Sequence, residues 1–353
     1  MNKSQMLQDM ILNEICSGRW KPGDPIPSRN QLCRKYKCSR NTVERAVSSL
    51  KQRGVLISNQ GGSTRVSQHS GRQNAAGPSD LFVVSGTLHE HSEREIRELF
   101  FPDLESSINV RAIRETDLLR HMDIVSRSGA AMIWVTPAVD SLWFMAHLER
   151  ADVPQLLINR NYLHYNFAGT DTASSIRSGL EWLHDVAGSE CALVSGCADL
   201  ARPYLAERLI AFYETAAVLN MSLRPEHIQV MPVLDLPAQV SEIGNRLFAS
   251  GNTPAGIVVL DSRITVSLVT LGHTYGKTPG RDYCLLTYDF LPELCKYDGI
   301  GMLRQQNEKL YLESQRWLLD GYAEKRLPFH SAIPAELITA APEETLSQTP
   351  SFC

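Results

Sequence analysis

The sequence predicts an α/β protein in which a small, basic domain precedes a larger, two-lobed body with parallel sheets. Three observations support this fold class. Two short amphipathic helices and a β-ribbon fit residues 26–68. From residue 81 onward, short apolar runs alternate with longer helical patterns. The chain has 353 residues, which is too long for one small domain.

The two short helices each have a predicted N-cap. Ser28 precedes the first and Ser39 the second. The second helix has apolar residues at helical spacing, and an outer face that begins Ser-Arg-Asn-Thr. One cation and short hydrogen-bonding side chains in a first turn suit the base edges of a DNA major groove. The apolar residues are Val43, Ala46, Val47 and Leu50.

A hairpin and a further helix complete the small domain. Residues 55–57 and 64–66 are strand-like, and the Gly61-Gly62 tip between them requires glycine's tolerance of positive φ. Residues 4–17 carry an apolar stripe that predicts a helix packed behind the pair. We expect Trp20, a lone aromatic beside a turn, to pack in the core rather than to contact DNA.

The charge is distributed unevenly. Through Arg72 there are 13 Lys and Arg against four Asp and Glu, a net charge of +9, and the remainder carries −13. A basic head on an acidic body fits a protein whose first domain neutralises phosphates while its body stays off the DNA. We place the DNA-binding domain at 1–68, a linker at 69–79, a larger domain at 80–341, and a C-terminal tail at 342–353.

Eight strands and eight helices are predicted in the body. Alternation at this spacing is typical of parallel sheets covered on both faces, and eight strands favour two lobes with a cleft. The predicted strands are 81–84, 109–113, 131–135, 155–158, 191–194, 228–231, 256–260 and 284–287. The predicted helices are 93–105, 117–128, 139–151, 173–187, 203–219, 237–250, 262–275 and 307–322.

Polar side chains follow several of these strands, where ligands bind in open parallel sheets. Asn159 and Arg160 follow the fourth strand, Asp261 the seventh and Asp289 the eighth, while Arg208 lies in the helix after the fifth. Carboxylates, guanidinium forks and nearby aromatic rings suit a polyhydroxylated ligand, since forks pair with vicinal hydroxyls and rings stack on apolar faces. The alternative for Asp261 and Asp289 is a helix or turn cap.

The small domain resembles the winged helix-turn-helix domain of the GntR family of bacterial transcription regulators. The resemblance covers residues 4–68 and rests on Gly18, residues 22–28, residues 39–46, Gly54 and residues 61–64, in the family's order and spacing. It implies DNA contacts by Arg29, Asn30, Ser39, Arg40, Asn41, Thr42, Arg45, Gln60, Gly61 and Arg65.

One position of this motif departs from the family. Where many members place a second DNA-facing arginine, this chain has Glu44 followed by Arg45. Either Arg45 contacts the phosphate instead, or Glu44 accepts a hydrogen bond from a cytosine amino group. Both alternatives stay open, and with them the operator preference.

Residues 80–340 resemble the LacI/GalR-type effector domain, which shares the two-lobed fold of periplasmic sugar-binding proteins. The segments concerned are 153–160, 169–171, 207–212, 255–261 and 285–289, and they imply ligand contacts by Asn159, Arg160, Arg208, Asp261 and Asp289. Three residues depart from the family's pattern: Asn159 where Asp is common, Leu260 where many members have Asn, and Thr287 where Gly usually precedes the aromatic-Asp pair.

No cofactor, metal or membrane segment is expected. The eight cysteines show no C-x-x-C spacing, which is typical of reduced, mostly buried thiols in a cytoplasmic protein. His89-Glu90-His91 lacks a third metal ligand. No window resembles a signal peptide or a membrane span. We therefore expect a cytoplasmic protein.

These observations predict a DNA-binding transcription regulator, most simply a repressor, controlled by a small molecule. A homodimer on double-stranded operator DNA is expected because a short recognition helix contacts only a few base pairs. The expected effector is a sugar, with a nucleoside or phosphosugar as alternatives. An enzyme body of the pyridoxal-phosphate type would need a cofactor-binding lysine. The lysines of the body lie in polar contexts: Lys277, Lys296, Lys309 and Lys325.

Overall fold

The computed structural model describes most of the chain. The described residues are 7–8, 10–11, 14–15, 19–21, 23–52, 56–58, 63–66, 78–86, 92–104, 108–126, 129–162, 164–200, 202–232, 236–249, 253–325 and 327–339. The expected hairpin tip with Gln60 and Gly61, the segment 89–91, the tail 342–353 and the linker up to residue 77 lie outside them.

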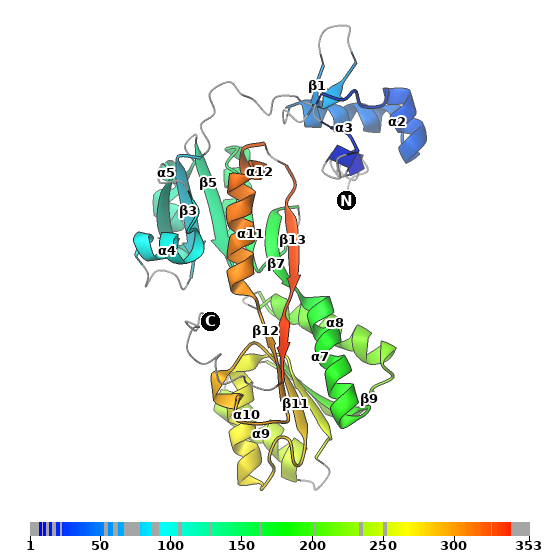
Figure 1. Cartoon of the computed structure of the whole chain (residues 1–353), viewed down its shortest axis with the longest axis vertical. Coiled ribbons are helices and arrows are strands. Elements are labelled where there is room, and N and C mark those ends of the chain that lie inside the picture. Colours follow the sequence, from blue (N-terminus) through cyan, green and yellow to red (C-terminus); the bar gives the residue numbers. More distant parts are fainter. Residues whose placement is uncertain are drawn as a thin grey trace. The chain divides into compact units, whose positions relative to one another are not determined.

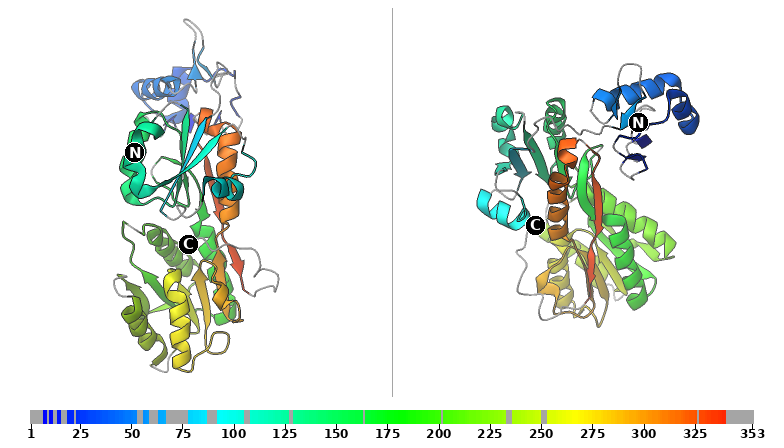
Figure 2. Two further views of the ribbon diagram at one scale, coloured as in Figure 1. Left: turned by 90° about the vertical axis from the view of Figure 1, so that its left-hand side faces the viewer. Right: turned by 45° about the horizontal axis from the view of Figure 1, so that its top comes forward.

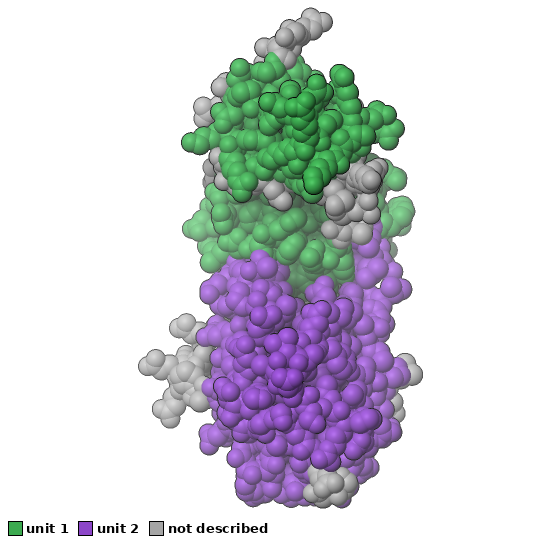
Figure 3. Space-filling view, turned by 90° about the vertical axis from the view of Figure 1, so that its right-hand side faces the viewer, with its two compact units in different colours: residues 1–137, 143–168, 311–331 green, residues 138–142, 169–310, 332–353 purple. Residues whose placement is uncertain are grey.

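The chain forms two compact units (Figure 3). Unit 1 comprises residues 1–137, 143–168 and 311–331, and unit 2 comprises residues 138–142, 169–310 and 332–353. Unit 1 includes the small N-terminal domain and one six-stranded sheet, and unit 2 is built on a second six-stranded sheet.

The N-terminal domain has the predicted helix pair and ribbon (Figure 1). Ser28 and Gln31 form a capping box at the start of α2. The Ser28 side chain accepts a hydrogen bond from the Gln31 backbone amide, and the Gln31 side chain accepts one from the Ser28 backbone amide. The Ser39 hydroxyl accepts the Thr42 amide at 3.2 Å, as expected of an N-cap for α3. The elements are α2 (Arg29–Tyr36), α3 (Arg40–Gln52) and the antiparallel strands β1 (Leu56–Ile57) and β2 (Arg65–Val66).

One apolar cluster holds this domain together. Leu7 and Ile11, from the predicted first helix, are helical and buried. Trp20 packs against the cluster, as predicted, and the Lys35 ammonium lies 5.2 Å from the centre of its ring. The buried members are Leu7, Ile11, Ile26, Leu32, Val43, Ala46, Val47, Leu50, Leu56 and Val66.

Unit 2 contains a sheet of strand order β14-β12-β11-β10-β8-β9, parallel except for β14. Its strands are β8 (Glu190–Gly196), β9 (Ser222–Met231), β10 (Gly256–Val259), β11 (Cys284–Tyr288), β12 (Ile300–Arg304) and β14 (Glu336–Ile338). Its helices are α7 (Thr172–Ala187), α8 (Tyr204–Val218), α9 (Leu236–Gly244) with a π-turn at Asn245–Ala249, and α10 (Ser262–Thr274).

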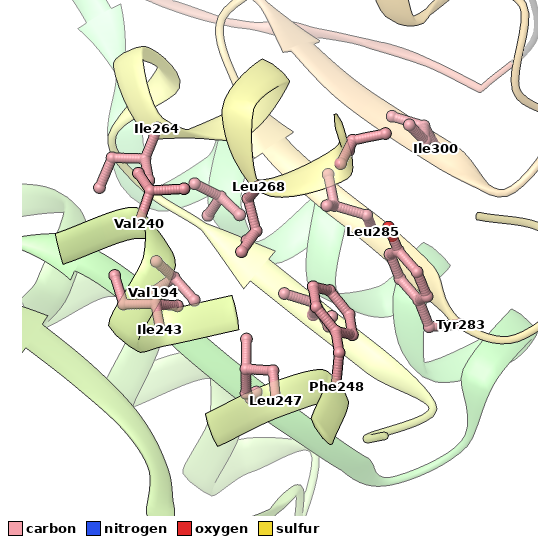
Figure 4. Packing of buried hydrophobic residues seen from close by; sticks show 14 of the residues in the cluster. Val194, Val240, Ile243, Leu247, Phe248, Ile264, Leu268, Tyr283, Leu285 and Ile300 are labelled. Atoms are coloured by element: carbon pink, nitrogen blue, oxygen red, sulfur yellow. The ribbon is translucent and has the colours of Figure 1, made fainter. Parts of the chain in front are cut away.

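Side chains of β10 alternate between two apolar clusters, which explains why the strand is buried throughout. Ile257 and Val259 belong to the cluster on the side of α9 and α10. The same cluster contains Leu268 of α10 and Phe248 of the π-turn (Figure 4). Val258 faces the opposite side, where α7 and α8 cover the sheet. The two helix layers can be followed in Figures 1 and 2. The predicted parallel sheet covered on both faces is therefore confirmed for this unit.

Unit 1 contains a sheet of order β13-β7-β6-β5-β3-β4. Its strands are β3 (Asp80–Ser85), β4 (Asn109–Arg114), β5 (Ala130–Val135), β6 (Gln155–Ile158), β7 (Asn166–Asp171) and β13 (His330–Pro334). Its helices are α4 (Glu93–Phe100), α5 (Leu118–Val125), α6 (Leu142–Arg150), α11 (Asn307–Leu319) and α12 (Tyr322–Lys325). The chain passes between the units on either side of residues 138–142 and within β7, α11 and β13.

All eight predicted strands of the body are present, but four further strands were not predicted. β7, β12, β13 and β14 lie in segments that the sequence analysis left without strands. β9 begins at Ser222, six residues before the predicted start. β13 and β14 are edge strands, and β7 and β12 each contain a glycine, so the sequence signal for these strands is weak.

The described cysteines are free thiols, but the expectation that most are buried is wrong. Among these described thiols only Cys191 is buried, and burial raises its pKa to about 12. The other five are partly exposed: Cys33, Cys38, Cys197, Cys284 and Cys295. Among the described residues, no helix is long and apolar enough to span a membrane.

Candidate DNA-binding and ligand-binding sites

The outer face of α3 presents polar side chains to solvent. Arg40, Asn41 and Arg45 are exposed, and within the described residues they make no side-chain hydrogen bond or ion pair. Thr42 is engaged differently, because its hydroxyl and its amide both bond to the Ser39 hydroxyl. The buried residues of α3 face the core, so these arginines point away from it. This arrangement offers cations and an amide to an external partner.

Arg29 occupies the junction of three elements. It begins α2, its Nη1 donates to the Thr64 hydroxyl at 2.9 Å, and its Nε lies 3.4 Å from Oε2 of Glu44 on α3. Its side chain is 22% exposed. Arg29 is therefore a partly buried side chain that links α2, α3 and Thr64, rather than a fully exposed cation. Asn30, the next predicted contact, is exposed.

The second ribbon strand is fixed to the body of this domain. The Ile26 amide donates to the Thr64 carbonyl at 2.9 Å, and the Val66 amide donates to the Asp24 carbonyl at 2.8 Å. Arg65 is exposed, but one guanidinium nitrogen donates to the Gly23 carbonyl at 3.0 Å. One guanidinium nitrogen of Arg65, a predicted DNA contact, is thus engaged in a hydrogen bond, and the other two nitrogens remain accessible.

In unit 2, Arg208 is the centre of a polar cluster. Its Nη1 donates to the Leu260 carbonyl at 2.8 Å, and its Nη2 lies 3.8 Å from Asp289 Oδ2. The guanidinium carbon lies 3.6 Å from the ring centre of Tyr288 and 4.6 Å from that of Tyr204, so the fork is held between two aromatic rings. Its side chain is only 8% exposed.

Asp289 is positioned by its backbone and by three side chains. Its φ of 71° is left-handed, a region that Asp tolerates better than most residues. Its Oδ2 accepts the Ser262 hydroxyl at 2.9 Å, and its Oδ1 accepts the Gln305 amide. The Gln305 carbonyl in turn accepts the Thr170 hydroxyl at 3.0 Å. The carboxylate is therefore oriented, with lone pairs left for a ligand.

Asp261 lies in the same unit but has a different role. Its side chain is 2% exposed, and its two oxygens accept from Arg263 at 2.8 and 2.5 Å. It also caps α10 through the Arg263 amide. Hydrogen bonding to Asp261 raises the pKa of Arg263. The capping alternative thus applies to Asp261, and Arg263, with a half-exposed side chain, is the more accessible member of this pair.

The departures at Leu260 and Thr287 have structural explanations. Leu260 is buried in the apolar core and contributes its carbonyl, not its side chain, to Arg208. Thr287 is fully buried, and its hydroxyl lies 2.8 Å from that of Thr265 on α10. Both side chains are buried, so these departures change the core of unit 2.

The other two predicted ligand contacts, Asn159 and Arg160, belong to unit 1. Asn159 follows β6 with a left-handed φ of 56°, and its amide donates to the Ala168 carbonyl at 2.8 Å. Arg160 donates to the Asn159 carbonyl at 2.7 Å. The structure thus assembles Arg208, Asp261 and Asp289 within one unit and assigns the other two to the other unit.

Sequence reasoning missed one member of the unit 2 cluster, Gln305, and noted Ser262, Arg263 and Tyr204 only as polar or aromatic neighbours. Gln305 follows β12, a strand that was not predicted, so the rule for strand ends was not applied to it. Ser262 and Arg263 were visible beside Asp261, and Tyr204 precedes Arg208 by four residues, one helical turn. These neighbours indicate a site of alternating donors and acceptors flanked by aromatic rings.

Comparison with protein families agrees with the geometry of the N-terminal domain. Residues 3–66 match the model of the bacterial regulatory proteins of the gntR family. The N-terminal domain is therefore a GntR-type winged helix-turn-helix domain, as the sequence motif predicted.

The sequence similarity to curated relatives extends beyond the N-terminal domain. The chain is 27% identical over 170 residues to the arabinose metabolism transcriptional repressor of Geobacillus stearothermophilus, covering 46% of this chain and 47% of that protein. It is 21% identical over 306 residues to the repressor of the same name from Halalkalibacterium halodurans, covering 81% of this chain and 80% of that protein. The chain thus spans about half of the first relative and most of the second.

Solved structures show the fold of the body. A regulatory protein of the LacI family from Chloroflexus aggregans superposes with a TM-score of 0.60 at 14% identity, covering 74% of this chain and 98% of that one. The transcriptional regulator CelR in complex with cellobiose gives a TM-score of 0.56 at 13% identity, covering 85% and 90%. The body therefore has the predicted fold of LacI-type effector domains.

Proposed function

We propose that this chain is a transcription repressor whose operator binding is controlled by a sugar or a closely related polyol bound at unit 2. The observation that carries the proposal is the Arg208–Asp289 pair, in which the Arg208 guanidinium contacts the rings of Tyr204 and Tyr288. The names of the curated relatives, repressors of arabinose metabolism, point to the same function.

The charges in the cluster favour a neutral polyhydroxylated ligand over a phosphosugar. Each arginine of the cluster is paired with an aspartate: Arg202 with Asp199, Arg208 with Asp289, and Arg263 with Asp261. A phosphate would have to compete with these carboxylates for the guanidinium groups. A hydroxyl can donate to a carboxylate and accept from a guanidinium at the same time.

The proposed DNA contacts are those of the GntR-type domain. Arg40 and Asn41 are suited to base edges, and Arg45 and Arg65 to phosphates, because all four are exposed. Asn30, Ser39, Thr42, Gln60 and Gly61 remain further proposed contacts, as do Asn159 and Arg160 for the effector. We further propose that the protein is a cytoplasmic homodimer that acts without catalysis, since two recognition helices are needed for useful specificity.

The test combines two measurements on the full chain. Thermal shift should detect arabinose, cellobiose or another neutral sugar, with stabilisation of about 2.7 kcal/mol at a hundred times the dissociation constant. Fluorescence anisotropy with DNA selected by the protein from random duplexes should then show that the same sugar lowers DNA affinity. Stabilisation by sugar phosphates alone, or by pyridoxal phosphate with a visible absorption band, would overturn the proposal.

A further inference from the structure

Glu44 lies on the DNA-facing side of α3 but carries the wrong charge for a phosphate. Its side chain is 46% exposed and stands one turn after Arg40, on the same face. A carboxylate beside a polyanion is unfavourable unless a cation neutralises it or a hydrogen-bond donor engages it. The structure supplies the cation, because Arg29 lies 3.4 Å from Glu44 Oε2.

The ion pair with Arg29 also keeps Glu44 from pairing with Arg40. Residues four apart on a helix can form an ion pair, so Glu44 could pair with Arg40. Within the described residues it pairs with Arg29 instead, and Arg40 has no ion pair. Because Thr64 holds the other side of the Arg29 fork at 2.9 Å, the pair is anchored to the ribbon. Arg40 thereby keeps its full charge for DNA.

One oxygen of Glu44 remains available. Oε2 faces Arg29, while Oε1 accepts no hydrogen bond within the described residues. An ionised carboxylate can only accept. In the major groove, guanine presents two acceptors and thymine one acceptor with a methyl group. Adenine presents an amino donor beside the N7 acceptor, which would repel a carboxylate, whereas cytosine presents an amino donor without an adjacent acceptor. The base edge that suits Oε1 best is that of cytosine.

We propose that Glu44 is a specificity-determining residue that accepts a hydrogen bond from a cytosine amino group, and that Arg29 is the positioning residue that orients it. The inference rests on the proposed function, since it requires the GntR-type domain to bind specific DNA. It goes further by naming the base and by assigning Arg29 an orienting role in addition to any phosphate contact.

The experiment selects binding sites from random duplexes with the full chain, its Glu44→Gln variant and an Arg29→Glu/Glu44→Arg double variant. The double variant reverses both charges, so an ion pair can still form between the two positions, while the Arg29 donor to the Thr64 hydroxyl is lost. Arginine prefers the acceptors of guanine. We therefore expect one position in each half-site to change from cytosine to guanine, with discrimination of roughly 5- to 150-fold.

Glu44→Gln should relax the preference at that same position, because an amide can both donate and accept. Thermal unfolding of each variant establishes that it is folded, and the double variant remains informative if the single variant is not. If the double variant selects the same sequence as the original chain, Glu44 has only a structural role and the inference is wrong. If the original chain selects no sequence at all, both the proposed function and the inference about Glu44 are wrong.

Discussion

The arginines on the outer face of α3 and the arginines of the unit 2 cluster are held in opposite ways. Arg40 and Arg45 on α3 are exposed and have no ion pair within the described residues. In unit 2, Arg208 and Arg263 lie 3.8 and 2.5 Å from aspartate oxygens. An unpaired guanidinium retains its charge for phosphates and guanine edges. A guanidinium beside a carboxylate presents donors and acceptors together, which suits hydroxyl groups. The same type of side chain is thus suited to two kinds of partner, according to which groups lie next to it.

Among substitutions that test this difference between exposed and paired arginines, we expect the largest loss of affinity at Arg40. Replacing Arg40 with Ala should remove the proposed bidentate base contact from each half-site of a dimer, so specific DNA affinity should fall roughly 30- to 25,000-fold. Fluorescence anisotropy with the selected duplex measures this. Lys51→Ala, which removes an exposed cation from the last turn of the same helix, is the matched control and should change affinity far less. Equal losses for both variants would mean that only total charge matters.

The next largest effect is expected at Arg208. Arg208→Met leaves the Leu260 carbonyl and the Asp289 carboxylate short of a donor, so we expect the fold to lose about 1–3 kcal/mol. Sugar binding should fall below detection in calorimetry while binding to selected DNA persists. Arg224→Met is the control, because its pair with Glu190 is half-exposed at 3.0 Å and worth at most about 1 kcal/mol. Unchanged sugar affinity in Arg208→Met would refute the assigned cluster.

A smaller and more selective effect is expected at Asp289. Asn also tolerates the left-handed φ of 71°, so Asp289→Asn should keep the stability of the fold while weakening sugar binding about tenfold. Asp289→Ala should lose a similar amount of affinity and, in addition, about 1–2 kcal/mol of stability. Thermal unfolding and calorimetry on both variants separate the charge from the backbone. Identical unfolding curves would argue against a conformational role for Asp289.

The smallest effect is expected at Arg45. If Arg45 contacts a phosphate, Arg45→Ala should weaken DNA binding uniformly across sequences, and the log–log salt dependence should become shallower by about 0.9 for each phosphate that is no longer neutralised. Anisotropy titrations at several salt concentrations with selected and random duplexes measure this. A change in sequence preference would instead place Arg45 against a base edge.

The sequence predicted most of the fold because its strongest signals are local. The buried strands β5, β6 and β10 are continuous apolar runs, and their predicted bounds differ from the observed ones by at most one residue. In contrast, β13 alternates exposed and half-buried residues at a sheet edge and ends in Pro334. Such strands are specified by the neighbour they pair with, so sequence patterns alone could not identify them.

The same limit applies to the sites. Arg208 and Asp289 were predicted because strand ends converge at one edge of a parallel sheet. Gln305 was missed because its strand was missed. The Arg29–Glu44 contact joins residues 15 positions apart on two helices, so it depends on how the helices pack. Local chemistry identifies candidate residues, and tertiary packing determines which partner each one meets.

The discontinuous make-up of unit 1 has a consequence for synthesis on the ribosome. β7 is paired on its outer side with the segment around β13, where Phe167 donates to the Phe329 carbonyl at 2.9 Å and Phe329 donates to the Asn166 side chain at 2.8 Å. Phe329 and Asn166 are 163 positions apart, so at translation rates of roughly 5–20 residues per second the edge of β7 waits about 10–30 s for its partner. During that interval an unpaired strand edge is accessible to other nascent chains. A transcript truncated before residue 327 would leave that edge open permanently.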